Sequence, residues 1–98
     1  MNGPHAHSPP ASADLIDIFC DQIWLQDGLA PSSLSSYRRD LTAWAGWLDR
    51  RGSSLLAAQR TDVEAFLAEQ FRAKAKATSI ARRLSSLRRF YALQLLQG

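Results

Sequence analysis

The 98-residue sequence has only one cysteine and no long apolar run, which argues against a disulfide-stabilised protein and against a membrane-spanning one. A single cysteine, Cys20, excludes an internal disulfide, and its place beside an apolar helical face suits a small buried thiol. No apolar run approaches the roughly 20 residues needed to span a bilayer. The N-terminus also lacks the basic-then-apolar pattern of a signal peptide, so we expect a cytoplasmic chain with no membrane partner.

The sequence also lacks the residue patterns of an independent enzyme. It has no nucleophile–base pair, no glycine-rich phosphate loop and no metal-type spacing of cysteine and histidine. Its carboxylates fall at helix caps or on solvent-facing stripes, so we expect no cofactor, no metal site and no catalytic residue. His5 and His7 lie in residues 1–12, a stretch with three prolines and no periodicity that we interpret as a flexible leader.

What remains is the composition of a small domain with an uneven charge distribution. Apolar residues are 46% and charged residues 21%, ordinary values for one globular unit, which we assign to residues 13–98. Residues 1–49 carry two basic and six acidic side chains, whereas residues 50–98 carry ten basic and three acidic ones. This asymmetry predicts one face for an anionic partner, although an unevenly charged solvated surface gives the same counts.

Helical periodicity begins directly after the leader, and no segment has the pattern of a strand. The first helix is expected at 13–27, with Ser12 as its N-cap and Gly28 as its stop. The second is expected at 31–51, with Gly52 after it.

The second half of the chain predicts two more helices. The third is expected to run from Thr61 to Arg72, because Thr61 and Glu64 have the spacing of a capping box. The fourth is expected at 78–97, and the longer preceding connection leaves room for an extra turn at 53–58. Short connections between sequential helices predict an all-α, compact bundle of four main helices.

Apolar spacing assigns one core face to each helix. The expected core residues are Leu15, Ile16, Phe19 and Ile23; Leu34, Tyr37, Leu41, Trp44 and Leu48; Val63, Phe66, Leu67 and Phe71; and Ile80, Leu84, Leu87 and Tyr91. Trp24, Trp47, Leu93 and Leu96 fall off these stripes. The last two point towards the arginine side of the fourth helix, which suggests that the natural chain continues beyond Gly98 and covers them.

The fourth helix carries a second pattern opposite its expected core face. At about 100° per residue, Arg82 and Arg89 project away from that face, with Ser85 and Ser86 beside them. No acidic side chain lies within the segment 78–91, so we expect these arginines to meet a polyanion, with DNA as the first candidate. Arginine and hydroxyl groups on a helix reach both phosphates and base edges. The far side of the second helix, where small residues alternate with arginine, suits either a phosphate backbone or solvent.

Two motifs in this chain resemble those of one protein family. Residues 24–41 read W-L-x-x-G-L-x-x-x-S-L-x-x-Y-R-R-D-L, and residues 76–91 read K-A-T-S-x-x-R-x-L-S-x-L-R-x-F-Y. In order and spacing they are similar to the two N-terminal motifs of Xer-type tyrosine recombinases, and the XerD branch fits best. Small departures, such as Ser33 where threonine is common and Ala30-Pro31 in place of a polar helix entry, leave the pattern intact.

The resemblance implies the N-terminal core-binding domain of such an enzyme, a SAM-like helical bundle. In that family the domain forms half of a clamp on duplex DNA, with its second and fourth helices against the major groove. Carried over by motif position, the DNA contacts would come from Ser33, Ser36, Arg38, Arg39, Lys76, Thr78, Ser79, Arg82, Arg83, Ser86 and Arg89.

The resemblance also implies where catalysis takes place. The catalytic arginines, histidines and tyrosine of the family belong to a separate C-terminal domain, and Tyr37 and Tyr91 fall on core stripes instead. The full-length recombinase would act with a related recombinase subunit as a tetramer on two DNA sites, as in chromosome dimer resolution, whereas the isolated domain would be a monomer. A helical protein–protein interaction module remains the alternative, because SAM-like bundles also bind proteins.

Overall fold

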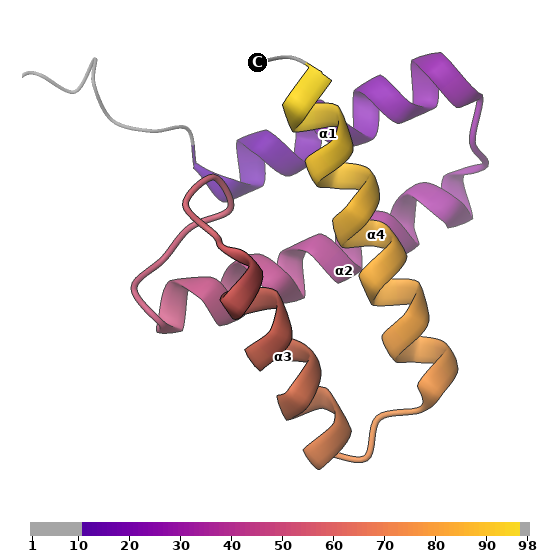
Figure 1. The fold of residues 1–98 in the computed structure, drawn as a ribbon. Helices are drawn as coiled ribbons and strands as arrows, with labels where there is room; N and C mark the ends of the chain where they lie inside the picture. The colour runs from indigo at the N-terminus through magenta and orange to yellow at the C-terminus, as the bar shows by residue number, and fades with distance from the viewer. Residues whose placement is uncertain (1–10, 97–98) are drawn as a thin grey trace, which may run out of the picture.

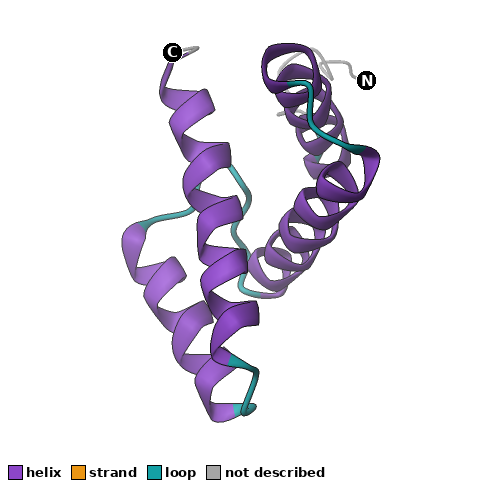
Figure 2. Ribbon diagram, turned by 90° about the vertical axis from the view of Figure 1, so that its right-hand side faces the viewer, coloured by secondary structure: helices purple, strands orange, loops and turns teal. Residues whose placement is uncertain are grey.

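Residues 11–96 are described by a computed structural model, and this range contains four α-helices and no strand. The helices α1 (Ser12–Asp27) and α2 (Pro31–Arg50) run antiparallel, as do α3 (Arg60–Arg72) and α4 (Ala77–Leu96). Figures 1 and 2 show that the second pair crosses the first, so that α4 passes across both α2 and α1. The predicted all-α bundle is confirmed. None of the described helices is long and apolar enough to cross a membrane.

Backbone geometry explains where the first two helices begin and end. Ser12 is already helical and Ala11 is the N-cap, because the N–H groups of Asp14 and Leu15 donate to the Ala11 carbonyl. The prediction of Ser12 as N-cap was therefore wrong by one residue. Gly28 ends α1 as predicted: its φ of 61° is left-handed, a conformation that glycine adopts without steric cost. At the end of α2, Gly52 has a φ of 75° and donates to the Asp49 carbonyl.

The capping box of α3 lies two residues before the predicted one. Gln59 is the last extended residue, and its N–H donates to the Asp62 carboxylate at 2.9 Å. Because α3 begins at Arg60, its capping-box position is Asp62. Glu64 lies two residues beyond that position and instead pairs with Arg60 at 3.3 Å. The predicted Thr61–Glu64 box was wrong because several polar residues here have capping potential.

An aromatic cluster forms the centre of the core, between the two helix pairs. Phe19 contacts Phe90 edge-on at a centroid distance of 5.4 Å, and Trp44 contacts Phe66 at 5.1 Å. Trp47 stacks on Trp44 and is itself buried, so it belongs to the core. The fully buried large side chains are Phe19, Ile23, Leu41, Trp44, Leu48, Leu55 and Phe90.

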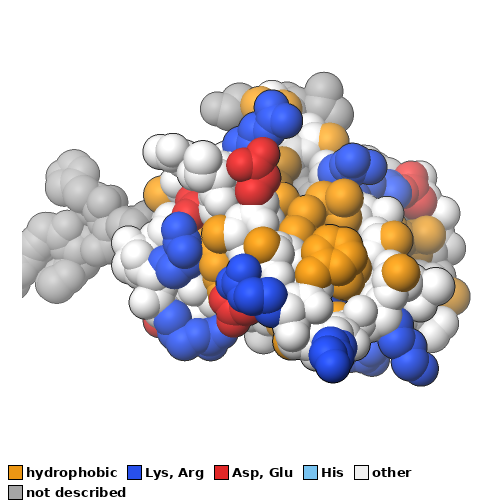
Figure 3. Space-filling model, turned by 60° about the horizontal axis from the view of Figure 1, so that its bottom comes forward, with side chains coloured by type: hydrophobic (Ala, Val, Ile, Leu, Met, Phe, Trp, Pro, Cys, Tyr) orange, Lys and Arg blue, Asp and Glu red, His pale blue; other side chains and the backbone are white. Residues whose placement is uncertain are grey.

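Two core faces differ from the sequence prediction. On α3, Phe71 is 63% exposed, because five residues at about 100° each turn it roughly 140° away from the buried Phe66. It lies next to the α3–α4 connection, and the face seen from this end of the molecule combines apolar surface with scattered lysine and arginine side chains (Figure 3).

On α4, the buried face is turned towards Phe90. Ile80, Leu87, Phe90 and Leu93 are buried, whereas Leu84 is only half-buried. Leu93 was predicted to lie off the core, and this was wrong because α4 crosses α1 as well as α2 and buries a wider face. The side chain of Leu96 lies outside the described residues.

The extra turn predicted at 53–58 is present and has a structural role. Leu55 within it is fully buried, and its carbonyl accepts a hydrogen bond of 2.7 Å from the Tyr91 hydroxyl. The same hydroxyl accepts one of 3.0 Å from the Trp44 Nε1. Tyr91 thus joins α2, the turn and α4 through one oxygen atom. Cys20 is buried in α1 as predicted.

Candidate nucleic-acid interface

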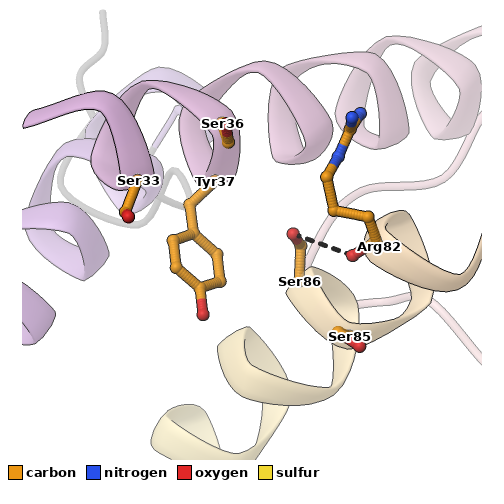
Figure 4. Close-up of a pocket in the computed structure, with 6 residues that line it drawn as sticks. All are labelled: Ser33, Ser36, Tyr37, Arg82, Ser85 and Ser86. Carbon is orange, nitrogen blue, oxygen red and sulfur yellow. Dashed lines mark hydrogen bonds between the residues drawn. The ribbon is translucent and has the colours of Figure 1, made fainter. Parts of the chain in front are cut away.

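A shallow hollow of about 210 Å³ lies between α2 and α4. Its lining is rich in hydroxyl groups and includes one guanidinium, contributed by Ser33, Ser36, Tyr37, Arg82, Ser85 and Ser86. Figure 4 shows that α2 supplies the first three side chains and α4 the others. Hydroxyl and guanidinium groups are donors that suit phosphate oxygens and base acceptors. The crossing of α4 over α2 therefore brings together four of the predicted DNA-contacting residues.

A buried carboxylate, Asp40, lies between the same two helices. Its side chain is 1% exposed. Arg82 donates to it through two nitrogens, from Nε to Oδ2 at 3.1 Å and from Nη2 to Oδ1 at 2.7 Å. Ser86 donates from Oγ to Oδ2 at 2.8 Å. The carboxylate thus has three charge-assisted hydrogen bonds, which compensate for its removal from water.

This cluster corrects three predictions from the sequence. Asp40 was placed on a solvent-facing stripe but is buried; it follows Tyr37 by three residues and precedes Trp44 by four, a spacing that puts it beside the core face. Ser86 was expected to face outward, and it is 2% exposed. Arg82 was expected to lack an acidic partner, but its partner comes from another helix. The hydrogen bond with Asp40 raises the pKa of Arg82, so its charge is retained.

Three further arginines of the predicted site also have partners on other helices. Arg38 pairs with Asp17 of α1, and Arg89 pairs with Asp27 at the end of α1. The hydrogen bond with Asp17 raises the pKa of Arg38. Part of the acidic charge of α1 is therefore neutralised by arginines from α2 and α4. The sequence of any one helix does not reveal these pairs, because the two partners come from different helices.

The third arginine, Arg83, donates to the side chain of Gln70 in α3. Arg39, Lys76 and Thr78 are exposed, and Ser79 is half-buried. Arg39 is on α2, Lys76 is the last residue of the α3–α4 connection, and Thr78 and Ser79 are in the first turn of α4. None of the four lines the hollow. The sequence-predicted site thus divides into a group at the hollow, a group tied to neighbouring helices and a group open to solvent.

Sequence reasoning omitted three residues at this place. Asp40 and Tyr37 lie within the Y-R-R-D-L motif, and Ser85 lies beside Arg82 on the outer face, but none was included among the contacts. Both tyrosines pack against the core as predicted, and burial raises the pKa of Tyr91. No group of three or more metal-ligating side chains occurs between residues 11 and 96.

Comparisons with known proteins agree with this architecture. The family described as "Phage integrase, N-terminal SAM-like domain" matches residues 16–98. The chain is 48% identical to the tyrosine recombinase XerD of Yersinia pestis over 77 residues, which is 79% of this chain and 26% of that protein. It is 42% identical to XerD of Haemophilus influenzae over 77 residues (79% and 26%), and 43% identical to XerD of Xanthomonas axonopodis pv. citri over 89 residues (91% and 29%).

The chain thus spans roughly a quarter of the length of these curated relatives. No solved structure matches it significantly. The family match covers nearly all of the four-helix bundle, including both helix pairs and the hollow between α2 and α4. On this evidence the chain belongs to the phage integrase N-terminal SAM-like domain family.

Proposed function

We propose that this chain is the DNA-binding N-terminal domain of a tyrosine recombinase of the XerD type and that it grips duplex DNA through α2 and α4. The observation that carries the proposal is the hollow between these helices, where three exposed or half-buried serines and one arginine converge. Its donors match the acceptor-rich surface of DNA. The basic second half of the chain supplies the long-range attraction.

The exposed residues extend this surface along both helices. Three residues are open to solvent and able to reach phosphates: Arg39 on α2, Lys76 just before α4, and Thr78 in its first turn. Arg38, Arg83 and Arg89 hold partners within the protein but keep further N–H donors, since a guanidinium carries five. Ser86 is buried and contributes through Asp40.

For the whole protein we propose a division of labour between domains. Residues 13–98 form the core-binding domain behind a leader at 1–12, and strand cutting and joining belong to a separate catalytic domain. The full-length recombinase would work in the cytoplasm with a related recombinase subunit, as a tetramer on two DNA sites, in reactions such as chromosome dimer resolution. The isolated domain would be a monomer that binds DNA weakly, since half a clamp forfeits the contacts of the other half.

Salt dependence of duplex binding tests the proposal. If the domain neutralises about four to six phosphates, log affinity falls against log salt with a slope of roughly −4 to −5. Arg39→Ala is expected to reduce the steepness by about one unit. Arg60→Ala is the matched control, because Arg60 is also an exposed arginine but lies at the start of α3, outside the lining of the α2–α4 hollow. Absence of binding at low salt, or a flat response, would refute the proposal.

One feature favours a second function, the protein-interaction module. Trp24 and Leu25 near the end of α1 are 56% and 79% exposed, large apolar side chains of the kind that interfaces cover. If this surface is the principal binding site, Trp24→Ser abolishes partner binding and Arg39→Ala leaves it unchanged. The salt titration separates the two functions, because apolar association does not weaken steeply with salt.

A further inference from the structure

Among the side chains of residues 11–96, Arg82 is bound by Asp40 along one of the two donor edges of its guanidinium. A guanidinium offers a side-on edge, formed by Nε and Nη2, and an end-on edge, formed by Nη1 and the second hydrogen of Nη2. Asp40 accepts from Nε and Nη2 and therefore occupies the side-on edge. The Arg82 side chain is 41% exposed and lines the hollow with Ser33, Ser36 and Ser85. Asp40 does not use the donors of the end-on edge, and solvent reaches the pair through Arg82, because the Asp40 side chain is only 1% exposed.

Asp40 is itself held in a fixed orientation. Ser86, one turn after Arg82 on α4, donates to Oδ2 of Asp40, and its Oγ also lies 3.2 Å from the Arg82 carbonyl (Figure 4). A side chain as long as arginine loses considerable conformational entropy when it is ordered on binding DNA. Fixing the guanidinium beforehand removes that cost and sets the direction of its donors.

We infer that Asp40 is a positioning residue for DNA recognition: it holds the side-on edge of Arg82 so that the end-on edge meets a pair of acceptor atoms on the DNA. This inference rests on the proposed function and goes beyond it, because it assigns a role to an acidic residue inside a basic interface. The paired acceptors belong either to a guanine edge, through O6 and N7, or to one phosphate. Asp40 acts through Arg82 and has no exposed surface for a contact of its own.

The alternative is that Asp40 is only a brace between α2 and α4, and the two roles predict opposite signs. Asp40→Asn removes a negative charge, which by electrostatics alone strengthens or preserves the attraction to DNA. If Asp40 positions Arg82, the same change weakens binding despite the more positive protein. Asp49→Asn makes the identical chemical change at an exposed position of the same helix and serves as the control.

The experiment measures affinity at low salt for a duplex that the chain selects from a random-sequence pool. We expect Asp40→Asn to weaken binding by at least about fivefold and Asp49→Asn to leave it equal or tighter. In an Arg82→Ala background, Asp40→Asn is expected to change affinity by less than about twofold, since the group it positions is gone. Unchanged or tighter binding by Asp40→Asn, or an equal loss in both backgrounds, would overturn the inference.

Two further measurements complete the test. Replacing guanine by 7-deazaguanine removes N7 and leaves the phosphates intact, so a loss of affinity in the wild-type chain but not in Arg82→Ala identifies a base contact. No loss, combined with a salt slope shallower by about one unit in Arg82→Ala, identifies a phosphate. Either result supports the inference. It is contradicted if Arg82→Ala has the same sensitivity to 7-deazaguanine and the same salt slope as the wild-type chain.

The wild-type chain provides a test that does not depend on a variant folding. We expect the Arg82 Nε–H resonance to exchange slowly with water in the free protein and to persist when DNA is added, while its Nη signals shift. Arg60, whose side chain is 91% exposed, gives the fast reference. Exchange at Arg82 as fast as at Arg60 would overturn the inference. Failure of the proposed function is distinguishable, because the wild-type chain itself would then not bind duplex DNA.

Discussion

Removing one oxygen atom from Tyr91 tests the packing of α2, α4 and the 53–58 turn together. In Tyr91→Phe the ring is retained, so no cavity larger than a hydroxyl forms. The Trp44 Nε1 loses its acceptor, and the Leu55 carbonyl loses the donor that lies 2.7 Å away. Both partner residues are 0% exposed, so water does not readily replace the lost hydroxyl. The substitution therefore leaves two buried polar groups unpaired.

The magnitude follows from these two groups. A buried donor or acceptor without a partner costs about 1–3 kcal/mol, and Tyr91 is only half-buried, which favours the lower part of that range. We expect the free energy of unfolding to fall by about 2–4 kcal/mol. For a domain of this size 1 kcal/mol lowers the melting temperature by about 4–8 °C, so the expected decrease is on the order of 10–20 °C.

Urea denaturation measures this loss, with an unchanged m-value as evidence that the two end states are the same. The chain offers a matched control in its other tyrosine, Tyr37, which is also half-buried and packs edge-on against Phe19. No hydrogen bond of the Tyr37 hydroxyl occurs within residues 11–96, so Tyr37→Phe is expected to change stability by less than about 0.5 kcal/mol. Equal effects of the two substitutions would refute the assigned role of Tyr91.

Three other predictions follow from burial. Leu87→Ala is expected to cost about 2–5 kcal/mol and Leu84→Ala clearly less, since Leu87 is 3% exposed and Leu84 is half-buried; thermal melts of the two variants rank them. Burial raises the pKa of Tyr91, so the folded state favours the neutral phenol: this contribution is complete below the unfolded value of about 10 and is lost as pH rises beyond it. Urea titrations between about pH 8 and 11 are expected to show a steeper loss for wild type than for Tyr91→Phe, and parallel curves would contradict the assignment. Burial also raises the pKa of the Cys20 thiol, so a thiol reagent at neutral pH is expected to react far more slowly with the native chain than with the urea-unfolded chain.

Local sequence determined the helices and indicated the family. The four helices follow from apolar periodicity, because a 3.6-residue repeat is a property of neighbouring residues. Gly28 terminates α1 because its left-handed φ of 61° favours glycine, and this too is a local constraint. The motifs at 24–41 and 76–91 indicated the family from spacing alone, and they placed serine and arginine on the helices that form the hollow.

Only the tertiary structure decided which face of each helix is buried and which charged side chains form ion pairs within the protein. Leu93 is buried and Phe71 is exposed because the way the two helix pairs cross sets which faces are in contact. The periodicity of a single helix carries no information about the angle of that crossing. Arg82 meets Asp40 across 42 positions of sequence, so neither segment shows the pair by itself. Burying a carboxylate is tolerated only where donors converge on it, and Arg82 and Ser86 converge only after α4 has packed on α2.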